Sequence, residues 1–202
     1  MKSIYIYGSS GHGLVVADIA KAYGFENIIF IDDGDNEYST FEEIQKNKNI
    51  PIAFGIGGNQ VRAKLFDKVK NSGFEIVTLI HPSAVISPSV TIGNGTVIMS
   101  NAVVNAKAII GDGVILNSGC IVEHECVIED FAHISPKAAL AGAVKIGEFT
   151  HIGIGSNVIQ GIKIGQNVIV GGGSMVIKDI DDNKKVAGVP AQVITSNHRG
   201  GG

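Results

Sequence analysis

The sequence predicts two parts, a small α/β domain at residues 1–79 and a parallel β-solenoid at residues 80–191. Before Ile80, short apolar segments alternate with helix-like segments, a pattern typical of a parallel sheet covered by helices. From Ile80 to Val176, every sixth residue is aliphatic over seventeen consecutive hexads. A period of six fits neither an α-helix nor simple strand alternation, so it indicates short strands separated by corners.

The first part is expected to form four strands and three helices. A glycine loop, Gly8–Gly13, follows the first strand and opens a helix that ends at Gly24. Asn59 is expected to cap the last helix, which Gly73 stops. The expected strands are residues 3–8, 27–33, 52–56 and 74–79, and the expected short helix between the second and third strands is residues 40–47.

In the solenoid, the first position of each hexad should point into the core. The fifth position, which is nearly always small or β-branched, should fill the same core. Recurring glycines such as Gly93, Gly111 and Gly165 are expected to relieve backbone strain at the corners. Three hexads make one coil of 18 residues, which stacks about 4.8 Å from the next coil. The pattern predicts about five coils with no inserted loop, followed by a disordered tail at residues 192–202.

Composition narrows the possible partners and compartments. The chain has 202 residues and a net charge of −3, which argues against nucleic acid as the main partner. No apolar run approaches the roughly 20 residues that span a bilayer, and no signal peptide is expected, so we expect no membrane partner. Two cysteines at inward positions indicate packing in a reducing cytoplasm rather than a disulfide framework.

The glycine loop and an acidic pair form the first candidate site. A loop that follows a strand and opens a helix can seat phosphate on its N–H groups. Its G-x-x-G-x-G spacing differs from the dinucleotide pattern, which weakens NAD as a ligand. Asp32 and Asp33 end the second expected strand, where a carboxylate can bind ribose hydroxyls. The alternatives are a nucleotide site, with a nucleotide sugar using both features, and a tight turn with a solvated carboxylate pair.

His124 and a histidine pair form the other candidates. His124 lies between Glu123 and Glu125, and the glycine 18 residues later, Gly142, leaves room beside it. The pattern fits a general base whose basicity a carboxylate raises, and equally a surface histidine in a charged corner. His133 and His151 are 18 apart and should stack, where they line a cleft or bind metal. No third metal ligand is obvious in the sequence.

The motifs together resemble a known family of enzymes. They are the glycine loop with His12, the Asp32–Asp33 pair, the entry Ile80–Ala84 and the run His124–Ile128. The hexads resemble those of hexapeptide-repeat acyltransferases, and the whole set looks like the PglD-type sugar acetyltransferases, to which sialic-acid O-acetyltransferases are similar in architecture. The resemblance implies a left-handed β-helix, a homotrimer with coenzyme A between neighbouring β-helices, and acetyl-CoA as co-substrate without a metal.

The resemblance also implies roles for individual residues. His124 would be the general base and Glu125 would raise its basicity, while the N–H of Gly142 is a candidate oxyanion donor. Two further groups would bind the substrates. The implied nucleotide-sugar contacts are Ser10, Gly11, His12, Asp32, Asp33, Gly57 and Asn117, and the implied acetyl-CoA contacts are His133, Gly142, Ile154 and Gly172.

The expected activity is direct acetyl transfer to the 4-amino group of a UDP-4-amino-4,6-dideoxy sugar in bacillosamine synthesis. The sequence leaves O-acetylation of sialic acid or of another nucleotide sugar, and N-acetylation of GDP-perosamine, as alternatives. Two other classes compete. A β-helix metalloenzyme of the carbonic anhydrase type leaves the phosphate loop unexplained, and a non-catalytic nucleotide-sugar sensor leaves His124 and its two glutamates without a role.

Overall fold

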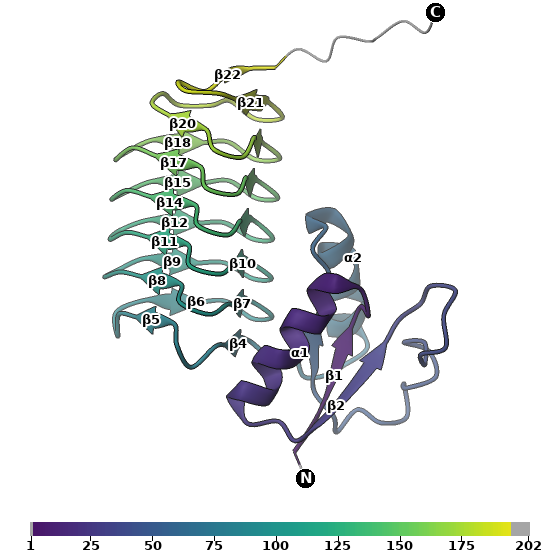
Figure 1. The fold of residues 1–202 in the computed structure, drawn as a ribbon. Coiled ribbons are helices and arrows are strands. Elements are labelled where there is room, and N and C mark those ends of the chain that lie inside the picture. The colour runs from purple at the N-terminus through teal and green to yellow at the C-terminus, as the bar shows by residue number, and fades with distance from the viewer. Residues whose placement is uncertain (1, 195–202) are drawn as a thin grey trace, which may run out of the picture.

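The computed structural model describes residues 2–194, which form an α/β part beside one end of a long β-solenoid (Figure 1). The α/β part has a three-stranded parallel sheet in the order β2-β1-β3. Its elements are β1 (Ser3–Tyr7), α1 (Gly11–Tyr23), β2 (Asn27–Ile31), β3 (Ile52–Phe54) and α2 (Asn59–Asn71).

The central strand of this sheet explains why a helix covers each face. Ile4 and Ile6 of β1 belong to the apolar cluster that contains α1, whereas Tyr5 and Tyr7 belong to the cluster that contains Phe66 of α2. Alternate side chains of a strand point to opposite faces, so β1 supplies both cores. As expected, α1 ends where Gly24 takes a left-handed conformation, with φ of 109°.

Three expectations for the α/β part are wrong. Residues 40–47 form hydrogen-bonded turns rather than a helix, with i→i−3 bonds such as Asn47 N–H to Ile44 O. The strand expected at residues 74–79 is reduced to a single bridge between Ile76 and Ile52 before the solenoid begins at Leu79. Gly58, not Asn59, is the N-cap of α2. The side chain of Asn59 is instead bonded to the solenoid.

The solenoid strands form three ladders, named here face 1, face 2 and face 3. Face 1 comprises β4 (Leu79–Ile80), β7 (Val97–Ile98), β10 (Ile115–Leu116), β13 (His133–Ile134), β16 (His151–Ile152), β19 (Ile169–Val170), β21 (Lys185–Ala187) and β22 (Gln192–Val193). Face 2 comprises β5 (Val85–Ile86), β8 (Val103–Val104), β11 (Ile121–Val122), β14 (Ala139–Leu140), β17 (Asn157–Val158) and β20 (Met175–Val176). Face 3 comprises β6 (Thr91–Ile92), β9 (Ile109–Ile110), β12 (Val127–Ile128), β15 (Lys145–Ile146) and β18 (Lys163–Ile164).

The chain visits faces 1, 2 and 3 in turn and forms a left-handed β-helix of about 6 turns, slightly more than the five expected. Each strand up to β20 pairs in parallel with the strand 18 residues away, as Ile115 does with His133. The register therefore holds to Val176 without an inserted loop, as predicted. Only the last coil is shorter, because Ile169 pairs with Lys185. The tail expected from residue 192 begins with β22, antiparallel to β21, and residues 195–202 lie outside the described part.

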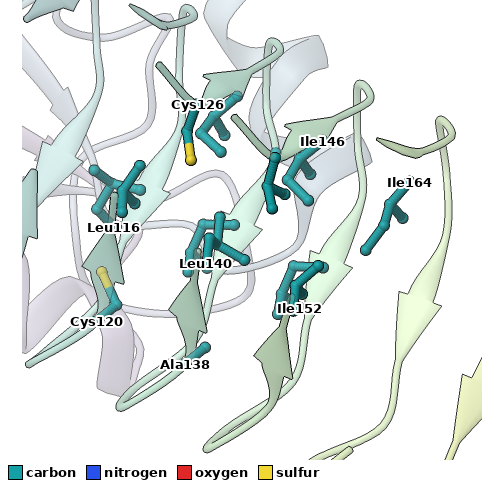
Figure 2. Close-up of a cluster of buried hydrophobic side chains, with 14 of the residues drawn as sticks. Leu116, Cys120, Cys126, Ala138, Leu140, Ile146, Ile152 and Ile164 are labelled. Atoms are coloured by element: carbon teal, nitrogen blue, oxygen red, sulfur yellow. The ribbon is translucent and has the colours of Figure 1, made fainter. Parts of the chain in front are cut away.

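The interior of the solenoid is filled as the hexads predict (Figure 2). Leu116, Leu140 and Ile152 occupy first positions and are at most 1% exposed, and Cys120 and Cys126 occupy fifth positions with no exposed surface. Complete burial of an aliphatic side chain of this size contributes roughly 1.5–3 kcal/mol. Repetition of this contribution along the column stabilises strands of only two residues each.

The glycines of the second hexad position have a different role from the one expected. Every sixth residue from Gly95 to Gly173 has φ between 53° and 72°, and eight of these fourteen residues are not glycine. Gly93, Gly111 and Gly165 are outside this set. A Cβ on Gly93 would lie 2.5 Å from the backbone of Gly111. These glycines therefore permit close approach between coils and do not relieve positive φ.

The α/β part lies against face 1 and one neighbouring edge of the prism. The corners between the numbered faces are named edge 1–2, edge 2–3 and edge 3–1. Leu79, Val97 and Ile115 of face 1 share an apolar cluster with residues of α1, and Figure 1 shows α1 beside β4, β7 and β10. Phe66 of α2 contacts Phe131, on edge 3–1, with ring centroids 5.4 Å apart.

Candidate active site

His124 lies on edge 2–3, between β11 and β12, with a carboxylate at one ring nitrogen. Its Nδ1 is 3.1 Å from Glu125 Oε2, and both side chains are more than half exposed. Glu125 has φ of 59°, the left-handed conformation found at every sixth residue from Gly95 to Gly173, and its side chain bonds back to the histidine. An ionised carboxylate accepts a hydrogen bond from Nδ1–H, so Nε2 carries the lone pair of the neutral ring. The pair is therefore suited to accept a proton at Nε2.

Gly142 lies directly against the His124 ring, one coil further along the column. A Cβ on Gly142 would lie 2.6 Å from both Cε1 and Nε2 of His124. The space expected beside the histidine is thus occupied by the ring itself. Within residues 2–194, the N–H of Gly142 donates to no backbone or side-chain acceptor, so it is free for a ligand oxygen. A groove of about 380 Å³ on face 2, lined by Ile121, Glu123 and Ile159 among others, runs beside this edge.

The glycine loop brings β1, β3 and α1 into backbone contact. A Cβ on Gly13 would lie 2.0 Å from Gly8 O, and one on Gly55 would lie 2.7 Å from Gly13 Cα. Ser10 is the N-cap residue of α1, but its side chain makes no capping bond. The N-terminal turn of α1, which contains Gly11, is thus exposed at a position where helix N–H groups favour an anion.

The acidic pair is divided between two roles. Asp32 accepts hydrogen bonds from Ser9 N–H at 2.9 Å and Ser9 Oγ at 2.7 Å, and these bonds from Ser9 lower the pKa of its carboxyl group. Asp32 therefore shapes the loop and remains near its mouth. Asp33 turns to the other side of the sheet, where it accepts from Lys68 Nζ at 2.7 Å and from Phe41 N–H at 2.8 Å. Burial raises the pKa of Asp33, but the bonds from Lys68 and Tyr7 outweigh it and lower the pKa overall. The structure does not bring the Asp33 carboxylate to the glycine loop.

A column of histidines on face 1 meets this loop. His133 and His151 stack with ring centroids 4.7 Å apart, and His12 lies 6.4 Å from His133. Asn117 Nδ2 donates to His133 Nε2 at 3.1 Å, and a Cβ on Gly57 would lie 3.9 Å from His12 Cγ. The structure therefore brings His12, Gly57, Asn117 and His133 together.

The buried histidines are neutral and only partly hydrogen-bonded. Burial lowers the pKa of His133 to about 3 and that of His12 to about 4, in both cases with a contribution from the nearby Arg62. His133 Nδ1 and His12 Nε2 are buried without a partner among the described residues. Buried polar atoms are usually paired, so these two nitrogens are positions where a ligand can bind. No group of three or more His, Cys, Asp or Glu side chains in residues 2–194 is arranged to hold a metal ion.

Ile154 and Gly172 lie one above the other on edge 1–2. A Cβ on Gly172 would lie 3.0 Å from Ile154 Cγ2, and Ile154 is 61% exposed. Edge 1–2 adjoins face 1, so three of the residues expected to contact acetyl-CoA, His133, Ile154 and Gly172, lie on neighbouring surfaces, whereas the fourth, Gly142, does not. His124, Glu125 and Gly142 lie on edge 2–3, which is opposite face 1 in a triangular prism. One chain therefore does not bring all the expected site residues into one cleft.

Arg62 and Lys68 hold parts of the candidate site in place, and neither residue was assigned a role from the sequence. The side chain of Arg62 is 1% exposed and bonds to both parts of the chain, and Lys68 binds Asp33. The signal for Arg62 was available, because Arg62, Phe66 and Val69 are spaced i, i+4 and i+7 and so lie on one helical face. In the described part, neither helix is long and apolar enough to cross a membrane.

Comparisons with known proteins agree with this fold. Residues 3–69 match the family model of the PglD N-terminal domain. The chain is 38% identical over 115 residues to UDP-N-acetylbacillosamine N-acetyltransferase of Bacillus subtilis (strain 168), a match that covers 50% of this chain and 52% of that protein. It thus spans about half the length of this curated relative.

Solved structures match nearly the whole chain, among them a domain of PglB and the protein PerB. The acetyltransferase domain of PglB from Neisseria gonorrhoeae FA1090 is 36% identical, with a TM-score of 0.90, 96% of this chain covered and 100% of that chain. PerB from Caulobacter crescentus, solved with CoA and GDP-perosamine, is 35% identical, with a TM-score of 0.91 and coverage of 96% and 97%. The fold and these matches define a left-handed β-helix acetyltransferase. Within that class, the chain belongs to the PglD-type sugar N-acetyltransferases.

Proposed function

We propose that this chain transfers the acetyl group of acetyl-CoA to the 4-amino group of a UDP-4-amino-4,6-dideoxy sugar, in a bacillosamine-type pathway. The observation that carries the proposal is the His124–Glu125 pair, with Glu125 at Nδ1 and a free Nε2. The name of the Bacillus relative and the CoA and GDP-perosamine held by PerB support a nucleotide-linked amino sugar as acceptor.

The reaction we propose is a direct transfer. The amine of the sugar attacks the thioester carbonyl while His124 Nε2 accepts the proton that the amine loses. The C–N bond forms, the C–S bond breaks, and the proton passes to the leaving thiolate of coenzyme A. The N–H of Gly142 would donate to the carbonyl oxygen as negative charge develops on it. Glu125 would stabilise the imidazolium formed at His124.

The cysteines are unsuited to a covalent alternative. Both thiols are buried in the solenoid core, and burial raises the pKa of Cys120 to about 12 and also raises that of Cys126. A thiol with a raised pKa is rarely ionised and is a poor nucleophile. Two free thiols also fit the reducing cytoplasm, which is the compartment we propose.

We further propose that the active site forms between copies of the chain in a homotrimer. His124 lies on edge 2–3, whereas His12, Gly57 and His133 lie on or near face 1, on the opposite side of the prism. A neighbouring copy that places its edge 2–3 against face 1 and edge 1–2 would complete the cleft. The apolar positions of face 2, including Val85, which is 63% exposed, offer surface for such contacts.

The binding roles of the remaining residues follow the same proposal. The nucleotide sugar would be held by the glycine loop with Ser10, Gly11 and His12, by Gly57 in the loop between β3 and α2, and by Asp32. Asn117 would contact its sugar. Acetyl-CoA would lie along face 1 and edge 1–2, against His133, Ile154 and Gly172. Because Asp33 is bonded to Lys68, we assign it to support of the sheet edge and leave ribose recognition to Asp32.

A panel of nucleotide-linked amino sugars tests the proposal. Purified protein is incubated with acetyl-CoA and UDP- or GDP-linked 4-amino sugars, and free thiol release and product mass are measured. We expect a gain of one acetyl group on the UDP-linked sugar, and none with His124→Ala at the same protein concentration. Preference for the GDP-linked sugar would replace UDP by GDP in the assignment. Absence of thiol release with every acceptor would refute acetyl transfer and favour a sensor.

A further inference from the structure

Arg62 is a buried cation in α2 whose charge is paired with no carboxylate in residues 2–194. Burial lowers the pKa of its guanidinium to about 10, so it remains protonated at neutral pH. The side chain makes five hydrogen bonds, and each goes to an oxygen atom. A guanidinium has five N–H donors, so its hydrogen-bonding capacity is fully used.

These bonds join the loop between β3 and α2 (residues 55–58), named here the Gly57 loop, to the solenoid. Nη1 donates to Ile56 O at 3.0 Å and to Gly57 O at 3.1 Å, in the loop between β3 and α2. Nε donates to Gly113 O at 2.6 Å and Nη2 donates to Phe131 O at 2.8 Å, both on edge 3–1. One rigid planar group therefore fixes the Gly57 loop to two successive coils.

The two solenoid acceptors bound a single coil, since residues 113 and 131 are 18 positions apart. That coil carries Asn117, His124 and Glu125. It also leads directly into β13, which begins with His133. The guanidinium thus grips the ends of the same coil that presents the candidate base.

The side chains on edge 3–1 determine at which coil α2 docks, and they exclude docking at the coil before or after it. Backbone carbonyls repeat at every coil, so they alone would allow docking one coil, or about 4.8 Å, too high or too low. The side chains remove the ambiguity. A Cβ on Gly95 would lie 2.9 Å from the ring of Phe66, so this coil needs a glycine where α2 docks. In the later coils, the rings of Phe131 and Phe149 occupy the same edge and stack with centroids 5.7 Å apart. Asn59 adds a third coil by donating from Nδ2 to Phe149 O at 2.8 Å.

We propose that Arg62 is a positioning residue that sets the height of the Gly57 loop on the β-helix, level with the coil that carries His124, and with it the height of the glycine loop that packs against Gly55. The inference rests on the proposed function. In a trimer whose rotation axis runs along the β-helix, equivalent coils of all copies lie at equal height. A loop fixed to one coil then presents the sugar amine to His124 of the neighbouring copy, even though that histidine lies on the opposite edge of its own chain.

The test separates positioning from folding by its dependence on the acceptor. In Arg62→Met, kcat with the nucleotide-linked amino sugar should fall about 10²-fold, the effect of misplacing a reactant by about 1 Å. The KM for acetyl-CoA should stay unchanged. The kcat/KM for the same amino sugar without its nucleotide should also stay unchanged, because that acceptor is not held by the loop. Arg62→Lys keeps the charge without the planar fork and should show a smaller fall of the same kind.

Matched variants and a second measurement keep the inference falsifiable. Lys64→Met removes an exposed cation from the same helix and should behave as wild type. If Arg62→Met does not fold, Arg62→Lys and Asn59→Ala carry the test. Amide hydrogen exchange at residues 55–58 should be faster in the Arg62 variants than in wild type. Equal losses with both acceptors, or wild-type kcat in both Arg62→Lys and Asn59→Ala, would overturn the inference. A wild-type protein that consumes no acetyl-CoA would instead refute the proposed function, and the exchange data would still show whether Arg62 holds the loop.

Discussion

Replacing Gly142 by alanine tests the geometry of the candidate base with one methyl group. The new Cβ would lie 2.6 Å from Cε1 and Nε2 of His124. Non-bonded carbon atoms normally approach to about 3.5–4.0 Å, so the ring must move by roughly 1 Å. Misplacement of a catalytic group by this distance costs about 10²-fold in rate. The φ of Gly142 is not positive, and the ring is 58% exposed and free to move into solvent. We therefore expect kcat to fall about 10²-fold while the melting temperature hardly changes.

Steady-state release of thiol from acetyl-CoA measures this loss, and a double variant shows whether it acts through the histidine. His124→Ala removes the ring that the methyl group displaces, so adding Gly142→Ala to it should cost nothing more. The N–H of Gly142 is kept in alanine, so its proposed contact with the oxyanion is kept as well. Turnover of Gly142→Ala within about twofold of wild type, or a further loss in the His124→Ala background, would refute the reasoning.

Three other predictions concern the base, the thiols and the buried histidine. His124→Gln should lower kcat by about 10²–10⁴-fold with little change in KM, and Glu125→Gln should have a smaller effect and shift the pH–rate profile, as read from initial rates. Replacing Cys120 and Cys126 together by alanine should leave turnover within about twofold, because neither buried thiol is a nucleophile; loss of activity in a folded protein would revive an acyl-cysteine. The pKa of His133 is lowered from 6.5 in the unfolded chain to about 3 in the folded protein. Between these pH values the unfolded chain binds the proton and the folded protein does not, so the free energy of unfolding should fall as the pH drops from 6.5 to about 3. His133→Gln should flatten this dependence in urea titrations, and an unchanged slope would show that the histidine is not the cause.

The solenoid was predictable because its core is specified locally. Each hexad places one aliphatic and one small residue inside, whatever the rest of the chain does, so periodicity alone indicated the fold up to Val176. The separation of His124 from His133 also follows from spacing, since nine residues are half of an 18-residue coil. Counting alone therefore places the two histidines on different sides of the prism.

Contacts between distant segments were not predictable in the same way. Asp33 and Asp32 look alike in the sequence, but Lys68, 35 residues later, binds Asp33 and withdraws it from the loop. From the sequence, Gly111 was expected to be a turn residue. The structure instead requires glycine there because a Cβ would lie 2.8 Å from the backbone nitrogen of Asp130 in the next coil. In both cases the deciding atom belongs to another element, so no local pattern records it.

The constant spacing of the ladder restricts how the length of this chain can change. Every pairing from β4 to β20 joins residues 18 apart, so removal of one 18-residue unit would leave the inward positions of all later coils inward. Removal of 17 residues would turn them toward solvent. Homologues that gain or lose whole coils beyond β13 would keep the grip of Arg62 on residues 113 and 131. The β-helix can therefore lengthen or shorten at its far end without changing the position of the proposed nucleotide-sugar site relative to the coil that carries His124.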